Sequence, residues 1–213
     1  QCGSSQQSVH FAAQAIMSGC MDVVVAGGVQ TMTQIPISSA MTLAAPLGFS
    51  DPFSGSTGWG ERYGAEPPTQ FKSAQMIADK WNLSRKDLEL FSYESHQRAL
   101  KAIAEGRFDR EIVPYGDVLM DETPRNSSLE KMAELDYLFG CDKVTAAVSS
   151  QTCDGSSAVL VVSEAALKRY NLTPRARIHH MSVRADDPIW MLTAPISATE
   201  YALKKAGMSL QDI

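Results

Sequence analysis

The pattern of apolar positions at the start of the chain predicts a helix followed by a strand. Small and apolar side chains recur there at the spacing of one helix face, at Val9, Ala12, Ala13 and Ile16. Ser18-Gly19 ends this pattern, and the apolar run 22–26 that follows is rich in valine and bounded by Gly27-Gly28. A helix followed by a short β-branched run predicts a buried strand in an α/β layer.

Similar patterns predict further elements along the chain. Helices are expected at 73–81, 84–106, 129–135, 164–170 and 196–206. Strands are expected at 118–125, where the strand ends in a turn, and at 175–183. Residues 31–63 are irregular, most of all at 54–60, and a segment of this length is typical of a binding loop or lid, with a mobile surface loop as the alternative.

Composition limits the classes of function. The 213 residues are 44% hydrophobic and 20% charged, as in an ordinary globular protein, and the formal charge of −5 disfavours nucleic acid as a partner. No apolar run reaches the roughly 18 residues that span a bilayer, and no signal peptide precedes Gln1. The four cysteines form no CxxC pair, so we expect neither zinc nor a disulfide framework, and a cytoplasmic setting.

Cys2 is the candidate nucleophile. Gly3, Ser4 and Ser5 suit a turn and a helix start, which places the thiol beside unpaired N–H groups at the positive end of the helix dipole. Both effects favour the reactive thiolate. The alternative is that Cys2 is a small buried residue, as most free cysteines are.

The residues around Cys2 resemble a known family. Residues 2–7 (Cys-Gly-Ser-Ser-Gln-Gln) and 23–33 (Val-Val-Val-Ala-Gly-Gly-Val-Gln-Thr-Met-Thr) look like the nucleophile segment of the thiolases, the acetyl-CoA acetyltransferases and 3-ketoacyl-CoA thiolases. The family usually has Glu where this chain has Gln30. The resemblance implies that Cys2 takes the acyl group.

Further segments extend the resemblance over the whole chain. Residues 87–99 and 106–114 resemble the thiolase loop domain, 144–162 resembles the segment that lines the pantetheine tunnel, and 187–195 resembles a stretch that reaches the acyl pocket. The resemblance implies contacts with coenzyme A at Arg125, Met132, Phe139, Ala146 and Ser150. It places Met191 in the acyl pocket.

The resemblance also implies the fold and its division. We expect an α/β protein with the layered α/β/α/β/α thiolase fold, incomplete and with an inserted loop domain. Residues 1–30 would end the N-terminal thiolase domain, 31–143 would form the loop domain over the coenzyme A site, and 144–213 would return to the N-terminal domain and begin the C-terminal one. A homodimer or homotetramer follows from the same resemblance.

The implied chemistry is acyl transfer through an acyl-cysteine, which makes or cleaves a 3-ketoacyl-CoA. Relatives supply a histidine base and a second cysteine from segments that do not occur in these 213 residues, so we expect this stretch alone to be inactive. Acyl-CoA and CoA are the expected substrates, with no tightly bound cofactor and no metal. Two alternatives are another cysteine-dependent condensing enzyme and a non-catalytic acyl-CoA or lipid-binding protein.

The other candidate groups are expected to be structural. Cys20, Cys141 and Cys153 are interpreted as packing residues, and His96 as a solvated residue on the polar side of its helix. His179 and His180 are neighbours on a predicted strand and would face opposite sides, which disfavours a shared metal. Residues 67–71 lack the pattern of short-chain biosynthetic thiolases, which indicates a degradative enzyme for a bulkier fatty-acid or steroid acyl group.

Overall fold

The structure is a computed structural model that describes residues 2–53, 55–65 and 67–213. The chain divides into two compact units: unit 1 contains Gln1–Leu47, Thr152–Ala185 and Ala194–Ile213, and unit 2 contains Gly48–Gln151 and Asp186–Thr193. Gln1 and Ser54, which belong to the nucleophile segment and the irregular segment of the sequence, lie outside the described residues, as does Glu66.

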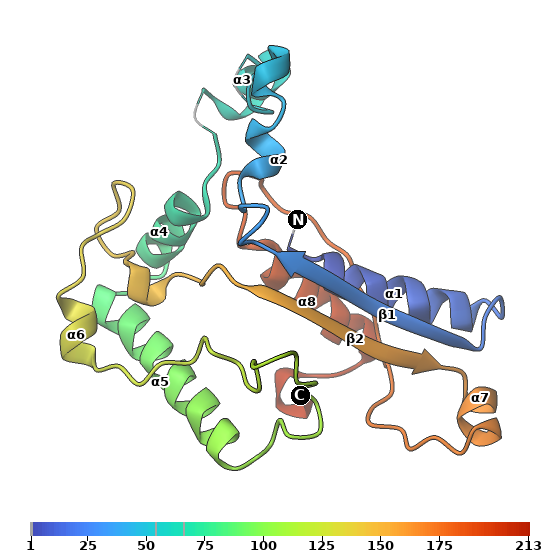
Figure 1. Ribbon diagram of the computed structural model, residues 1–213. Helices are drawn as coiled ribbons and strands as arrows, with labels where there is room; N and C mark the ends of the chain where they lie inside the picture. Colours follow the sequence, from blue (N-terminus) through green and yellow to red (C-terminus); the bar gives the residue numbers. More distant parts are fainter. Residues whose placement is uncertain (1, 54, 66) are drawn as a thin grey trace. The chain divides into compact units, whose positions relative to one another are not determined.

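Unit 1 is built on two long strands, β1 (Val23–Thr31) and β2 (Asp154–Val162), which pair antiparallel along their whole length (Figure 1). The register pairs Val23 with Val162 and Thr31 with Asp154. The segment that follows the nucleophile helix in the sequence therefore lies beside a second motif that is more than a hundred residues away along the chain.

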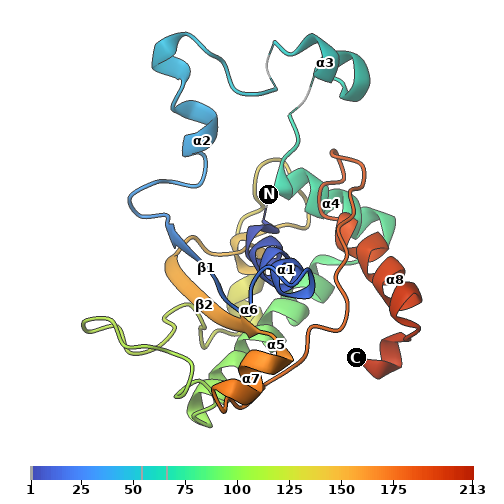
Figure 2. The same cartoon turned by 90° about the vertical axis from the view of Figure 1, so that its right-hand side faces the viewer.

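The nucleophile helix, α1 (Ser4–Met17), packs on these strands through Ala12 and Ala13, both of which are buried (Figures 1 and 2). It ends as predicted at Ser18 and Gly19, which has a φ of +77°. The prediction of a buried strand over 22–26 is wrong in part: Ala26 is 5% exposed, but Val25 is 67% exposed. The reason is that α1 covers only one face of the described two-stranded sheet.

The rest of unit 1 consists of short elements and one longer helix. These are α2 (Ser39–Thr42), η1 (Ala45–Leu47), α7 (Glu164–Arg169), α8 (Ala194–Ala206) and η3 (Leu210–Asp212). Ser163 caps α7 by accepting the Ala166 N–H at 3.1 Å and donates its hydroxyl to Asp22 at 2.7 Å. These contacts join the start of β1 to the end of β2.

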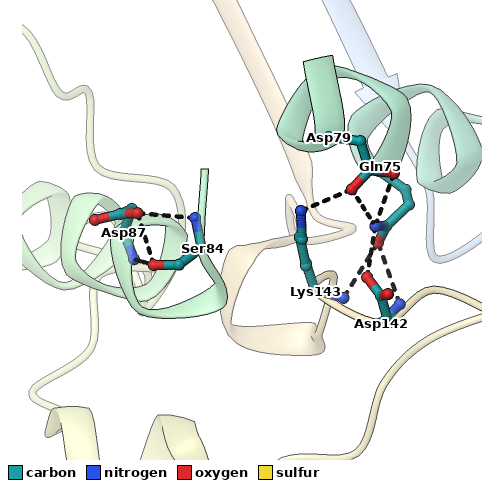
Figure 3. Close-up of polar contacts among 6 residues, drawn as sticks. All are labelled: Gln75, Asp79, Ser84, Asp87, Asp142 and Lys143. Carbon is teal, nitrogen blue, oxygen red and sulfur yellow. Dashed lines mark hydrogen bonds and ion pairs between the residues drawn. The ribbon is translucent and has the colours of Figure 1, made fainter. Parts of the chain in front are cut away.

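Unit 2 is helical. Its elements are α3 (Thr57–Tyr63), α4 (Gln70–Lys80), α5 (Arg85–Ala104), α6 (Leu129–Ala133) and η2 (Ala146–Val148). The start of α5 follows directly from its sequence, because Ser84 and Asp87 form the reciprocal capping box drawn in Figure 3. The helix ends before Gly106, whose φ of +67° suits glycine.

A polar cluster joins α4 to the turn at 142–143 (Figure 3). The Gln75 side chain donates to Asp142 at 2.6 Å and accepts the backbone N–H groups of Asp142 and Lys143. The Lys143 ammonium lies 2.7 Å from the Asp79 carboxylate, and this contact, followed by Gln75, lowers the pKa of Asp79. The cluster holds the turn that precedes Ala146 against α4.

Several predicted elements differ from the structure. Residues 118–125 and 175–183 form no strand in the described chain, apart from a single bridge between Tyr115 and Val118. A strand needs a neighbour with which to exchange backbone hydrogen bonds, and β1 and β2 pair with each other. The segment 54–60, expected to be the most irregular, contains the start of α3, because Ser56 caps the helix by accepting the Trp59 N–H.

Candidate active site

Cys2 lies in unit 1, immediately before α1, and is exposed. Gly3 is the N-cap residue, and among the described residues the first turn has neither a side-chain cap nor an acidic side chain. The first amide groups of a helix have no partner within the helix, so a negative charge near Cys2 would meet free N–H donors and the positive end of the dipole. The structure therefore confirms that the thiol stands at the mouth of a helix.

The backbone of Cys2 has a φ of +59°, in the left-handed region that only glycine adopts readily. Such conformations cost of the order of 1–3 kcal/mol for other residues and are concentrated at functional sites. This backbone conformation makes Cys2 the strongest candidate for a reacting group in unit 1.

Asp154 joins the two motifs of unit 1. Its carboxylate accepts the Thr33 backbone N–H at 2.9 Å and also the Thr33 hydroxyl. These bonds, the hydroxyl first, lower the pKa of Asp154. In the sequence Asp154-Gly155 can be interpreted as a turn, but the structure gives these residues a different role: they begin β2 and anchor the end of β1.

The five predicted coenzyme A residues all lie in unit 2, and four of them are exposed: Arg125, Phe139, Ala146 and Ser150. The structure links their segments. Gln151, next to Ser150, donates its side-chain amide to the Thr123 carbonyl at 3.1 Å. Arg125 in turn donates its backbone N–H to Nδ1 of His96 at 3.1 Å. The guanidinium of Arg125 thus stands on a segment that is fixed at both ends.

Phe139 is presented by a tight turn. Phe139 and Gly140 have φ values of +48° and +76°, and the Cys141 N–H donates to the Leu138 carbonyl at 2.9 Å. The residue is 78% exposed, and its ring centroid lies 4.3 Å from that of Phe71 on α4. An exposed ring supported from one side can stack on a planar ligand with the other.

Met132 differs from the other predicted residues because it is only 4% exposed. It packs inside unit 2 on α6, which is held by Arg85: the guanidinium donates to the carbonyls of Met132, Ala133 and Leu135 at 2.8–3.0 Å. Little of the Met132 side chain can meet a ligand, so its evident role is to anchor α6. A contact between Met132 and coenzyme A stays a prediction.

Met191, the predicted acyl-pocket residue, is 37% exposed with a φ of +45°. Its segment is held to α4, where the Ser73 hydroxyl donates to the Ile189 carbonyl at 2.9 Å and the Lys80 ammonium lies 4.8 Å from the centre of the Trp190 ring. Ile189 also lines a cavity of about 210 Å³ in unit 2. The other lining residues are Tyr63, Gly64, Ala65, Pro67, Pro68 and Lys72.

The remaining cysteines are only partly as expected. Cys141 is half-buried with its sulfur 3.6 Å from the Phe71 carbonyl, and burial, followed by the Asp142 charge, raises the pKa of its thiol. Cys20 and Cys153 are exposed, so they do not pack in the described structure. Across the described ranges no group of three or more His, Cys, Asp and Glu side chains could hold a metal ion, and no helix is long and apolar enough to cross a membrane.

Comparison with known proteins identifies the family. The sequence profile of the thiolase N-terminal domain matches residues 1–165. The chain belongs to the thiolase family. This thiolase chain is 55% identical over 217 residues to the steroid 3-ketoacyl-CoA thiolase of Mycobacterium tuberculosis, a match that covers 100% of this chain and 53% of that protein.

Solved thiolase structures confirm the α/β thiolase fold. Human mitochondrial 3-ketoacyl-CoA thiolase in complex with CoA matches with a TM-score of 0.80 at 30% identity, over 100% of this chain and 55% of that one. The dimeric peroxisomal thiolase of Saccharomyces cerevisiae matches with a TM-score of 0.85 at 29% identity, over 100% and 55%. The chain spans about half the length of the curated relatives it matches.

The sequence patterns did not indicate a functional role for three residues: Arg85, Glu89 and His96. Arg85 and Glu89 have opposite charges four residues apart, which is a recognisable helix pair, and their side chains meet at 2.6 Å. His96 was expected to be solvated, but it is half-buried and hydrogen-bonded to the Arg125 backbone. No local signal in the sequence shows that these side chains hold segments 29 to 50 residues away.

Proposed function

We propose that this chain carries the nucleophile and part of the coenzyme A site of a degradative 3-ketoacyl-CoA thiolase. The observation that carries the proposal is the geometry of Cys2: an exposed thiol with a left-handed backbone, beside an uncapped helix N-terminus, within the segment that matches the thiolase profile. The domain assignments made from the sequence, with a loop domain at 31–143, remain part of the proposal.

In the proposed reaction the Cys2 thiolate attacks the 3-keto carbon of a 3-ketoacyl-CoA, and a negative charge develops on the carbonyl oxygen. Amide N–H donors at the start of α1 would stabilise that charge without reorganising. The bond between C2 and C3 then breaks, leaving the acyl group on Cys2 and an acyl-CoA carbanion that takes up a proton. The thiol of a second CoA accepts the acyl group and restores Cys2.

The second unit supplies the proposed coenzyme A contacts. Arg125 offers a guanidinium suited to a phosphate, and Phe139 an exposed ring suited to adenine. Ala146 and Ser150 would leave room for the pantetheine arm, and Met132 of α6 would be a further contact. Met191, together with the cavity of about 210 Å³ that Ile189 of the same segment lines, would receive a bulky acyl group, in keeping with the steroid substrate in the name of the mycobacterial relative.

The proposed setting is a cytoplasmic homodimer or homotetramer that uses acyl-CoA and CoA as substrates and no tightly bound cofactor. The dimeric state of the yeast peroxisomal thiolase supports a dimer here.

The test is acylation of the protein in its complete natural form. The protein is incubated with an acyl-CoA and mapped by mass spectrometry, and an acyl adduct is expected on Cys2. The C2S variant should lose the adduct and, on the order of 10³-fold or more, the thiolysis rate, while C20S, which changes another exposed cysteine of unit 1, should keep both.

No adduct, or an adduct on Cys141 or Cys153, would refute the nucleophile assignment. The substrate class is tested separately by comparing rates on acetoacetyl-CoA and on a longer 3-ketoacyl-CoA. A clear preference for acetoacetyl-CoA would count against the bulky acyl group.

A further inference from the structure

One face of α5 carries polar side chains that bind other segments of unit 2. Arg85, Glu89 and His96 lie four and seven residues apart and therefore share one side of the helix. We call these three residues the α5 polar stripe. Glu89 is only 4% exposed, which is rare for a carboxylate unless it is paired, and the Arg85 side chain is 20% exposed.

The first end of the stripe holds the C-terminal end of α6. Arg85 donates through Nη2 to the carbonyls of Met132, Ala133 and Leu135, and through Nε to Glu89 at 2.6 Å. Its guanidinium also lies 4.8 Å from the centre of the Tyr137 ring. Glu89, followed by Tyr137, raises the pKa of Arg85. These contacts fix the chain just before the turn that presents Phe139.

The second end of the stripe holds the segment that carries Arg125. Nδ1 of His96 accepts the Arg125 backbone N–H at 3.1 Å. A ring nitrogen accepts only when it carries no proton, so this contact requires the neutral imidazole with its proton on Nε2. The Arg125 segment has little regular structure of its own, and its local support is a turn in which Asp121 accepts from Thr123 at 2.9 Å and 2.7 Å.

We propose that Arg85 and His96 are positioning residues, which hold 121–139 in the conformation that binds the adenosine 3′-phosphate end of coenzyme A. This inference rests on the proposed function, because it takes CoA as the ligand of that segment. The chemistry fits: the stripe fixes the backbone beside an exposed guanidinium at one point and beside an exposed aromatic ring at the other, and these two groups suit a phosphate and an adenine.

The experiment measures KM and kcat for CoA and for 3′-dephospho-CoA with the complete natural protein. The variant H96L removes the acceptor of the Arg125 N–H, whereas H96N keeps an acceptor close to the position of Nδ1. Because one backbone hydrogen bond is lost, KM for CoA should rise about fivefold in H96L. KM for 3′-dephospho-CoA and kcat should stay within about twofold, and H96N should restore KM for CoA to within about twofold of wild type.

A second pair of variants tests the other end. R85K keeps a positive charge beside Glu89 but loses the planar fork that reaches three carbonyls, so it should lower the preference for CoA over 3′-dephospho-CoA. The matched controls are R98K and R98L, because Arg98 lies on the same helix, 79% exposed, in an ion pair with Glu94 at 3.0 Å. Neither control should change the preference. Labelled-histidine NMR of wild type should show Nδ1 unprotonated.

The outcomes separate the two proposals. An unchanged preference for CoA in both H96L and R85K overturns the inference and leaves the proposed function standing. The inference is also overturned if KM rises equally for CoA and 3′-dephospho-CoA, which a merely structural role would produce, or if the R98 controls change the preference for CoA in the same way. If wild type shows no saturable dependence on CoA, the proposed function itself fails, and the inference with it.

Discussion

Gly27 offers a test of the sheet that joins the two motifs of unit 1. A Cβ added at Gly27 would stand 2.9 Å from the Ser157 carbonyl oxygen and 3.2 Å from the Ala158 Cβ, both on the paired strand β2. The closer of these atoms belongs to the backbone, so it cannot rotate away as a side chain would. The variant G27A must therefore push β1 and β2 apart or distort their pairing.

The size of the effect follows from two opposing contributions. Overpacking by one methyl group at an unyielding site costs about 1–3 kcal/mol. Replacing glycine by alanine also restricts the unfolded chain, which returns about 0.4–1 kcal/mol. The net loss in the free energy of unfolding should be between about 0 and 2.6 kcal/mol, centred on about 1.3 kcal/mol. At about 2–4 °C per kcal/mol for a chain of this size, the central value lowers the melting temperature by about 3–5 °C.

Gly28, the next residue of β1, provides the matched control. A Cβ there would meet no atom within 4 Å, so G28A should leave stability unchanged or raise it by about 0.4–1 kcal/mol. Both variants are compared with wild type by urea and thermal unfolding followed by circular dichroism. If G27A proves as stable as G28A, the close approach of the two strands at Gly27 is refuted.

Three further predictions concern charges and thiols. Ser84, through its hydroxyl and then its backbone N–H, lowers the pKa of Asp87 from the ordinary 3.8, so the stabilisation by this carboxylate is present above that pH and is lost as the pH falls through the lowered pKa. The variant D87N should be less stable than wild type in urea at pH 7 and equal to it near pH 2. A difference in stability that is constant with pH would contradict this prediction. When the protein reacts with iodoacetamide at pH 7, peptide mapping should show that Cys141 is labelled more slowly than the exposed Cys2, because burial raises the pKa of the Cys141 thiol and hinders access of the reagent. Equal labelling rates of the two cysteines would count against this prediction. The variant R85M should lower the urea midpoint more than R98M does, because R85M leaves the buried Glu89 carboxylate without its partner. The double variant R85M/E89L should recover much of the lost stability. A double variant that is no more stable than R85M would refute this account.

Helix boundaries could be predicted from the sequence because their causes are local. Ser84 begins α5 with a capping box, Ser128 caps α6 through the Lys131 N–H, and Gly207 follows α8 with a φ of +67°. Each of these signals acts within three or four residues. The same is true of Cys2, whose position at the mouth of α1 follows from the glycine and serines beside it.

Strands and helix faces could not be predicted in the same way. The run 175–183 has a strand-like composition, yet it forms no strand in the described chain because no neighbour pairs with it. On α5 the apolar Phe91 is 77% exposed, whereas the charged Glu89 is buried. An arginine that makes three carbonyl contacts can bury a carboxylate, and periodicity does not record that possibility.

The sequence by itself determined the family, the α/β class, the thiol before α1 and most helix ends, since each depends on residues adjacent in the chain. Tertiary structure alone decided that β1 lies beside β2, with Asp154 bound to Thr33, and that Arg85 and His96 hold the segments of Phe139 and Arg125. The physical reason is that these contacts join residues from 29 positions apart, as with His96 and Arg125, to 139 positions apart, as with Val23 and Val162, and a hydrogen bond depends on distance in space, which the order of residues does not specify.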